Sequence, residues 1–298
     1  MKFLRTFFSA LAFVAALNSM PVSANELPLS EKVWNGQETV PQNGLPDGKI
    51  AVSKSANGQE VAAWYGSPTT RYRHGILGDA VEAGSLHVEY RGGRHFQFRL
   101  PNSQVFEDRT PRIVDLDGDG RPEIVTIRTY QSAGASVAIF GVRNDQLVEL
   151  ASTEAIGRSN RWLNIAGIRD YAERGSLQIA YVETPHIGGT LYFVEWNGNR
   201  LQPIASIYGT SNHEIGSREQ DLSADMDYDN DGHMDLVVPS IDRRALRVFG
   251  FSGRQLAELE MVSLPSPVAR RANMDQPQKA GCVHFELKNR SMFEFCRP

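Results

Sequence analysis

Two matching stretches decide the fold, and they read IVDLDGDGRPEIVTI over residues 113–127 and MDYDNDGHMDLVVPSI over residues 226–241. Each joins a short apolar run, an acidic loop that contains glycine, and a second apolar run, which predicts two strands connected by a turn. Acids occupy the first, third, fifth and ninth loop positions in both copies. They are Asp115, Asp117, Asp119 and Glu123 in the first loop, and Asp227, Asp229, Asp231 and Asp235 in the second.

Acids at this spacing predict a metal site. Three carboxylates at alternate positions of a tight loop can converge on one centre, and the ninth-position acid can complete the set. Oxygen ligands in this number favour calcium, with the backbone carbonyl of Arg121 or His233 as a further ligand. An acidic surface turn without metal is the alternative, which two copies in register make less favourable. An EF-hand is excluded because Thr126 and Val238 stand where its twelfth-position acid belongs.

Two degenerate copies extend the pattern into a repeat, over residues 76–90 and 168–182. Aligned on the loop glycines Gly84, Gly120, Gly175 and Gly232, the copies are 36, 55 and 57 residues apart, and a fifth copy is expected at Gly281. Neither degenerate copy is expected to bind calcium, because apolar residues or an arginine replace its acids. In the second copy we expect the Arg174 guanidinium to take the place of the ion beside Asp170.

The repeat predicts an all-β fold, because hairpin signals lie between the loops and no long helical period occurs after the N-terminal segment. Each unit then supplies four strands, which is a β-propeller blade. Five blades are expected, and six remain open. Residues 49–66 are interpreted as the outer hairpin of an incomplete blade, so that strands from both termini close the ring.

The two acidic loops resemble the calcium loops of FG-GAP or VCBS repeats, which occur in integrin α-subunit propellers and in many exported bacterial proteins. The wider repeat pattern covers residues 48–298. The resemblance implies a calcium ion in the loop between the first two strands of particular blades, where it stabilises the loop. Two Ca²⁺ sites are therefore expected, at residues 115–123 and 227–235.

The N-terminus has the features of a signal peptide over residues 1–24, with basic Lys2 and Arg5, an apolar core and a small-residue cleavage site. Residues 25–47 would form an N-terminal extension. No later segment is apolar for long enough to span a membrane, so a periplasmic or secreted protein is expected. The net charge of −4 falls to about −6 without Lys2 and Arg5, which disfavours nucleic acid as a partner.

Cys282 and Cys296 are the two cysteines, and Asn289 lies midway between them. The segment between them reads as two short strands around a turn, so the cysteines would face each other across a hairpin. In an oxidising compartment this arrangement predicts a disulfide. Two unrelated buried thiols are the alternative.

A second candidate site lies on the face of the propeller opposite the acidic loops. Its basic and aromatic residues could bind a protein or an anionic glycan through bidentate hydrogen bonds and stacking. The alternative is that the arginines pair with neighbouring acids such as Glu107, Glu214 or Glu219. The candidates are Arg73, His74, Arg112, Arg161, Trp162, His186, His213 and Arg218, with Arg71 and Arg109 nearby.

Three functions fit these features. The first is a calcium-stabilised binding or structural module that is not an enzyme. The second is a glycan-acting lyase or hydrolase in which His186 or His213 is the general base, and the third is a subunit that only stabilises a larger complex. No GxSxG motif supports a serine hydrolase, and no HxH or HExxH spacing supports a transition-metal site.

Overall fold

The computed structural model of the protein describes residues 29–35, 40–41, 43–55, 58–272 and 281–298. The predicted signal peptide, residues 1–24, and its cleavage site lie outside these residues. One short helix, α1 (Glu31–Trp34), is described, and all other regular elements are strands. No helix within the described part of the chain is long and apolar enough to cross a membrane.

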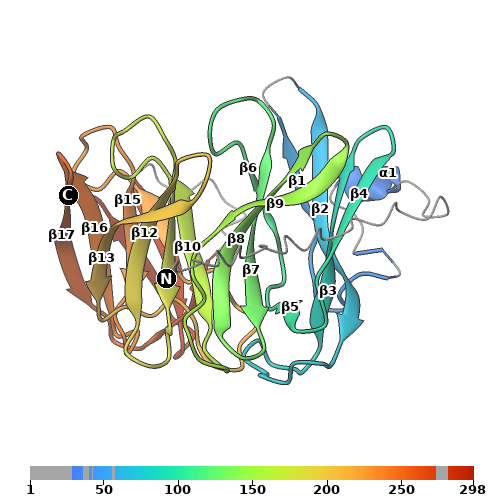
Figure 1. Ribbon diagram of the computed structural model, residues 1–298. Coiled ribbons are helices and arrows are strands. Elements are labelled where there is room, and N and C mark those ends of the chain that lie inside the picture. The colour runs from blue at the N-terminus through green and yellow to red at the C-terminus, as the bar shows by residue number, and fades with distance from the viewer. Residues whose placement is uncertain (1–28, 36–39, 42, 56–57, 273–280) are drawn as a thin grey trace, which may run out of the picture.

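The strands form four antiparallel sheets (Figure 1). The first holds β1 (Ala51–Lys54), β2 (Glu60–Thr69), β3 (Glu82–Tyr90), β4 (Arg94–Arg99), β5 (Gln104–Phe106), β6 (Arg112–Val114), β7 (Glu123–Tyr130), β8 (Gly134–Arg143) and β9 (Gln146–Ser152). The second holds β10 (Leu163–Arg169), β11 (Gln178–Glu183), β12 (Thr190–Trp196) and β13 (Leu201–Tyr208). The third holds β14 (Ala224–Met226), β15 (Asp235–Pro239), β16 (Ala245–Ser252) and β17 (Gln255–Ser263), and the fourth β18 (Val268–Arg271), β19 (Cys282–Leu287) and β20 (Met292–Cys296).

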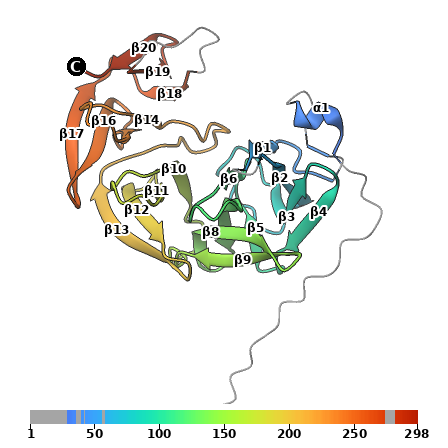
Figure 2. The same ribbon diagram turned by 90° about the horizontal axis from the view of Figure 1, so that it is seen from above.

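Successive groups of strands follow one another around a common axis (Figure 2). The first strand of a group, such as β10 or β14, lies nearest the axis, and the later strands pair outward in chain order. The second strands, β7 and β15, are buried at nearly every position. Both faces of these strands are covered by neighbouring strands and sheets, so that polar residues of β7 such as Thr126 and Arg128 are buried as well. The all-β class and the antiparallel sheets are therefore as predicted.

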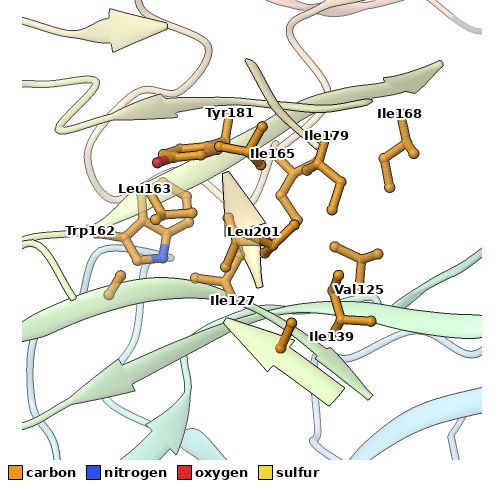
Figure 3. Packing of buried hydrophobic residues seen from close by; sticks show 14 of the residues in the cluster. Val125, Ile127, Ile139, Trp162, Leu163, Ile165, Ile168, Ile179, Tyr181 and Leu201 are labelled. Atoms are coloured by element: carbon orange, nitrogen blue, oxygen red, sulfur yellow. The ribbon is translucent and has the colours of Figure 1, made fainter. Parts of the chain in front are cut away.

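The cores lie between neighbouring groups of strands. Figure 3 shows one of them, in which Ile127 and Ile139 from β7 and β8 meet Ile165, Tyr181 and Leu201 from the second sheet. Similar clusters join the second sheet to the third and the third to the fourth. The groups thus pack side chain to side chain, with few hydrogen bonds between sheets, as expected for blades.

The short strand β5 joins the first two groups into one sheet. It pairs with β7 over Gln104–Phe106 and with β3 at the single position Ala83–Phe106. Without this strand, β1–β4 and β6–β9 would be two four-stranded units. In the first unit, β1 ends at Lys54 and β2 begins at Glu60, so the connection is shorter than the acidic loops 115–123 and 227–235.

The interpretation of residues 49–66 is wrong. Their described part contains β1 and most of β2, the two innermost strands of the first unit, and β2 continues the sheet to β3 and β4. The degenerate copy at residues 76–90 is wrong for the same reason: Gly84 lies inside β3, and Asp79 lies in the β2–β3 connection. That connection belongs to the face opposite the acidic loops, since chain direction reverses at every strand.

Cys282 and Cys296 form the predicted disulfide. They are directly opposite each other in the β19–β20 hairpin, so the bond fastens the last two strands together. Within the described residues, the fourth sheet contains only strands near the C-terminus. Closure of the ring by strands from both termini stays a prediction, because residues 1–28 lie outside the description.

Candidate functional site: acidic loops and the opposite face

The loops 115–123 and 227–235 connect the first and second strands of their units, β6 to β7 and β14 to β15. With the loop 170–178, between β10 and β11, they define what we call the acidic face. In each of the two loops, carboxylates from the first, third and ninth positions lie within 4.8 Å of one another. These are Asp115, Asp117 and Glu123 in one loop and Asp227, Asp229 and Asp235 in the other.

The fifth-position acids, Asp119 and Asp231, were predicted to join the other three carboxylates of their loops, but they do not. Asp119 Oδ1 accepts a hydrogen bond from the Arg121 backbone N–H at 2.7 Å, and Asp231 Oδ1 accepts one from His233 at 2.8 Å. These bonds hold the turn, and neither acid belongs to the converging group. The structure therefore brings together three of the four predicted carboxylates in each loop.

One buried oxygen in each loop lacks a hydrogen-bond partner among the described residues. Gly120 N–H donates to Asp115 Oδ2 at 2.9 Å, whereas Asp115 Oδ1 is buried without a donor. Asp227 Oδ1, at the same loop position, is also buried without a donor. A buried carboxylate oxygen without a partner is costly. An oxygen-loving cation at the convergence point would remove that cost in both loops, so these residues fit calcium.

The two loops differ in how much of their charge the protein itself neutralises. Glu123 is fully buried, and Arg143 Nη2 lies 2.6 Å from its Oε1. Arg121 in turn pairs with Asp119 at 2.5 Å, which lowers the pKa of that carboxyl. Burial nevertheless raises the pKa of Glu123, because the loss of solvation outweighs the arginine.

Asp235 has no such arginine. It accepts a hydrogen bond from the Tyr228 backbone N–H at 2.8 Å. Burial, together with repulsion from Asp229, Asp231 and Asp227, raises its pKa to about 6. Within the described residues, an arginine forms an ion pair with this loop only at Asp227, whose Oδ2 lies 3.9 Å from Arg297 Nη1. The loop 227–235 is therefore the less compensated of the two.

A glycine lies across the strand pair from the ninth-position acid. Gly250 neighbours Asp235, and a Cβ atom on Gly250 would overlap Asp235 Oδ1. Gly141 is the corresponding residue beside Glu123, by the pairing of Ile124 with Phe140. Absence of a side chain at Gly250 leaves room for Asp235 to turn into its loop, whereas a Cβ atom on Gly141 would meet Leu150 and Arg143 first.

The loop 170–178 corrects one prediction. Its Asp170 carboxylate accepts hydrogen bonds from the backbone N–H groups of Arg174 and Gly175, at 2.9 and 2.7 Å. The Arg174 guanidinium does not pair with Asp170 but lies 3.1 Å from Glu195. Glu195 stands directly across from Gln178, in the position that glycine holds beside the acidic loops. The Asp170 carboxylate is therefore satisfied by backbone donors, and the Arg174 guanidinium pairs with a different carboxylate.

Most of the basic candidates on the opposite face are paired internally. His74 Nδ1 lies 2.7 Å from Glu107, Arg112 pairs with Asp108, and Arg218 Nη2 lies 2.9 Å from Asp79. Arg109 pairs with Asp47 at 3.0 Å, and Arg161 donates to the Asn160 carbonyl at 2.9 Å. Arg73 is exposed without an ion pair in the described part of the chain. Most of these basic residues are therefore paired, as the alternative from the sequence had it. Most of their partners are not the acids named there, which were Glu107, Glu214 and Glu219.

His186, His213 and Trp162 do meet on the opposite face. His213 is fully buried, and its Nε2 lies 2.9 Å from the Ser217 carbonyl, which can only accept a hydrogen bond. Nδ1 of neutral His213 must then accept from His186 Nε2, 2.9 Å away. Trp162 is buried beside both rings and donates from Nε1 to the Glu107 carbonyl. Burial lowers the pKa of His186 to about 4 and of His213 to about 3.

The sequence did not reveal an exposed apolar group beside this pair. Ile187, Tyr208 and Ile241 are 61%, 68% and 39% exposed, and they surround Gly188 and Gly189. We call these three residues the apolar cluster. The adjacent glycines were the signal that could have found it, because both have positive φ and the Tyr208 ring lies over Gly188.

No protein-family model matches the sequence, and no curated protein matches it. Among solved structures, BBS1N in complex with ARL6DN, soaked with lead, aligns with a TM-score of 0.50 at 10% identity, covering 87% of this chain and 68% of that one. The mercury-soaked complex gives 0.49 at 11% identity, covering 84% of this chain, which spans 65% of that protein's length. At 10% identity, the likeness to the lead-soaked complex shows a propeller-like fold and nothing more.

Proposed function

We propose that the protein is an exported, calcium-stabilised β-propeller that acts as a protein-interaction module. The apolar cluster is the observation that carries the interaction role, and the converging carboxylates carry the calcium. The propeller would have five blades, the last with three described strands. Export rests on the signal-peptide features of residues 1–24, and the disulfide agrees with an oxidising compartment.

Calcium would be held by the converging groups of both loops. Asp115, Asp117 and Glu123 would bind one ion, and Asp227, Asp229 and Asp235 the other. The ion would supply positive charge to buried carboxylates and a partner to the two unbonded oxygens. Its role would be structural, because it fixes the connection between the first two strands of each blade.

The apolar cluster supports a protein partner because its loops are held in place by backbone hydrogen bonds. Gly209 and Thr210 N–H donate to the Gly189 carbonyl at 2.8 and 3.1 Å, and Ile241 N–H donates to the Gly209 carbonyl at 3.0 Å. Little flexibility would therefore be lost on binding. Two exposed aliphatic side chains and a tyrosine suit an apolar protein surface, whereas isoleucines offer no hydrogen bonds to a glycan. The BBS1N structure is itself a complex with ARL6DN.

A photo-crosslinking amino acid beside Ile187 tests this role in the envelope and medium of the producing cell. A crosslinked protein should be identified, purified and titrated against the wild-type chain, Ile187→Asp and Met261→Asp. Met261 is 60% exposed on the outer strand β17 and serves as the matched control. We expect at least tenfold weaker binding for Ile187→Asp and no change for Met261→Asp. Equal loss in both variants, or no crosslink, would contradict the proposal.

The enzyme alternative has less support from the histidine pair. Both ring nitrogens of buried His213 are engaged, so His213 has no nitrogen left to accept a substrate proton. His186 keeps Nδ1, and turnover of a polyanionic glycan that is lost in His186→Ala would restore the lyase or hydrolase hypothesis. A subunit that only stabilises a complex would bind its partner through surfaces that Ile187→Asp leaves intact.

A further inference from the structure

A cavity of about 440 Å³ lies on the propeller axis. Residues of the innermost strands β6, β10, β14 and β18 line it, together with Lys49 before β1 and residues 218–221. We call it the axial cavity. Its volume lies within the usual range for sites that bind small molecules, roughly 300–1,000 Å³.

The connection between β13 and β14 bounds this cavity on the opposite face. It crosses to the first unit, where Gly216 N–H donates to the Ile76 carbonyl at 2.9 Å. Gln220 is fixed in the same segment, because Nε2 donates to Asp108 at 3.1 Å and its carbonyl accepts from Asn164 at 2.8 Å. The cavity therefore has a hydrogen-bonded floor rather than a loose loop.

The charge of the lining is unbalanced. Six cationic residues face three acids. The cations are Lys49, Arg109, Arg112, Arg169, Arg218 and Arg271, and the acids are Glu219, Asp221 and Asp225. A concave site lined mainly by one sign of charge concentrates ions of the other sign, in a protein whose net charge is negative.

Three of the six lining cations form ion pairs with acids outside the lining, and the other three have fewer partners. Arg109, Arg112 and Arg218 bind acids outside the lining. Arg169 Nε lies 3.2 Å from Asp225, whose carboxylate also accepts from the Tyr171 hydroxyl, and Arg169 Nη1 donates to the Ile168 carbonyl at 2.8 Å, which leaves Nη2 without a hydrogen bond among the described residues.

Arg271 and Lys49 are the least engaged of the lining cations. The Arg271 guanidinium is 3.9 Å from Asp221, beyond hydrogen-bond range, and Asp221 is 64% exposed. Among the described residues, neither the Arg271 guanidinium nor the Lys49 ammonium group has a side-chain hydrogen bond. Arg169, Arg271 and Lys49 come from three different blades, so they approach the axis from different directions.

We propose that the axial cavity binds a small anion with two or more carboxylate or phosphate oxygens, held by Arg271, Arg169 and Lys49. A guanidinium group can bind such oxygens in a bidentate manner, and an ammonium group adds a point charge. The site is independent of the apolar cluster and of the calcium loops, so its failure would leave the proposed function untouched.

Calorimetric titration with succinate and with inorganic phosphate tests this site, at constant ionic strength and constant free calcium. Arg271→Gln is compared with Arg270→Gln, which removes the same charge one residue away. Arg270 is exposed, pairs with Glu286 at 2.7 Å and does not line the cavity. Thermal melting of both variants with calcium checks that they fold.

We expect wild type and Arg270→Gln to bind at least one anion equally well, and Arg271→Gln to bind it at least tenfold more weakly. Tighter binding of succinate assigns the site to carboxylates, and tighter binding of phosphate assigns it to phosphate groups. Absence of binding to the wild type, or equal weakening by both variants, overturns the proposal.

Discussion

The loops 227–235 and 170–178 occupy the same place in neighbouring units, yet they satisfy their charge in opposite ways. In the first, Asp235 turns into the loop beside Gly250, three carboxylates converge, and Asp227 Oδ1 lacks a donor. In the second, neutral Gln178 stands at the ninth position and Glu195 takes the place of the glycine. Arg174, Ser176 and Gln178 all donate to Glu195.

This difference shows that charge in the loop between the first two strands of a blade can be balanced in either of two ways. One leaves negative charge for an external cation, and the other closes a hydrogen-bonded network from its own side chains. The loop 115–123 is intermediate, because Arg143 from β8 reaches Glu123 at 2.6 Å. The chain has a serine, Ser252, at the position of β16 that corresponds to Arg143. Loop 227–235 should therefore depend most on the ion.

Removal of calcium should give the largest effect. Each site contributes about 2.7 kcal/mol when free calcium is 100 times Kd, so chelation should cost about 5 kcal/mol and lower Tm by roughly 10–20 °C. The measurement is thermal melting of the mature protein with calcium and with a chelator. The double variant Asp117→Ala/Asp229→Ala should lose the shift, while Asp170→Ala should keep it. A shift that survives the double variant would break the comparison.

Gly250→Ala should remove one site. Its Cβ would overlap Asp235 Oδ1, so the acid would leave the loop. We expect calcium stoichiometry to fall from two to one and calcium-linked stability to fall by about 2–3 kcal/mol, measured by equilibrium dialysis and by melting. Gly141→Ala is the matched control, because its Cβ would meet flexible ends of Leu150 and Arg143, at 2.8 and 3.0 Å. Loss of one ion in both variants would show that the glycine does not distinguish the loops.

The sequence predicted those features that depend on local spacing. Three acids of each loop converge because they lie within nine residues, and Cys282 meets Cys296 because a short hairpin joins them. The copy at residues 76–90 failed because only Asp79 and Gly84 supported it, and two matching residues do not fix which strand of a blade follows. The partners of the basic residues were equally hidden, since Asp47 and Asp79 come from distant loops.

The axial cavity and the apolar cluster could not be read from spacing either. Lys49, Arg169 and Arg271 reach the axis only because three blades place them there. Ile187 and Ile241 lie in two separate connections and Tyr208 ends β13, so alternation within one strand says nothing about how they meet. Sequence patterns describe neighbours along a strand, whereas these sites are built from neighbours around a ring.

Where buried polar groups are hydrogen-bonded without an ion, the stability they contribute should depend on pH and not on calcium. The pair of His186 and His213 is such a case. His186 and His213 have pKa values of about 4 and 3, below the ordinary value of about 6.5. Their neutral forms are required for the folded state, so stability is full above pH 6.5 and falls as the pH drops towards 4. In excess calcium we expect a loss of about 2 kcal/mol from each of these two histidines between pH 7 and pH 5, measured by urea unfolding.

The control for this effect is the double variant His186→Gln/His213→Gln, compared with itself at the two pH values. Its loss between pH 7 and pH 5 should be smaller than that of the wild type. Buried His87, whose pKa is about 3, leaves a remainder of the same sign. An unchanged loss in the variant would assign acid sensitivity to other groups.

Arg174→Ala should give the smallest effect and is the most direct test of how loop 170–178 is satisfied. The variant loses a partly exposed ion pair with Glu195, which is worth about 0.5 kcal/mol. Asp170 keeps both backbone donors, at 2.9 and 2.7 Å, so the loss should be the same with calcium and with chelator. Urea unfolding in both conditions measures it. If Arg174→Ala instead costs more than about 2 kcal/mol, or becomes stabilised by calcium, the guanidinium replaces the ion after all, and the two loops differ only in the source of their positive charge.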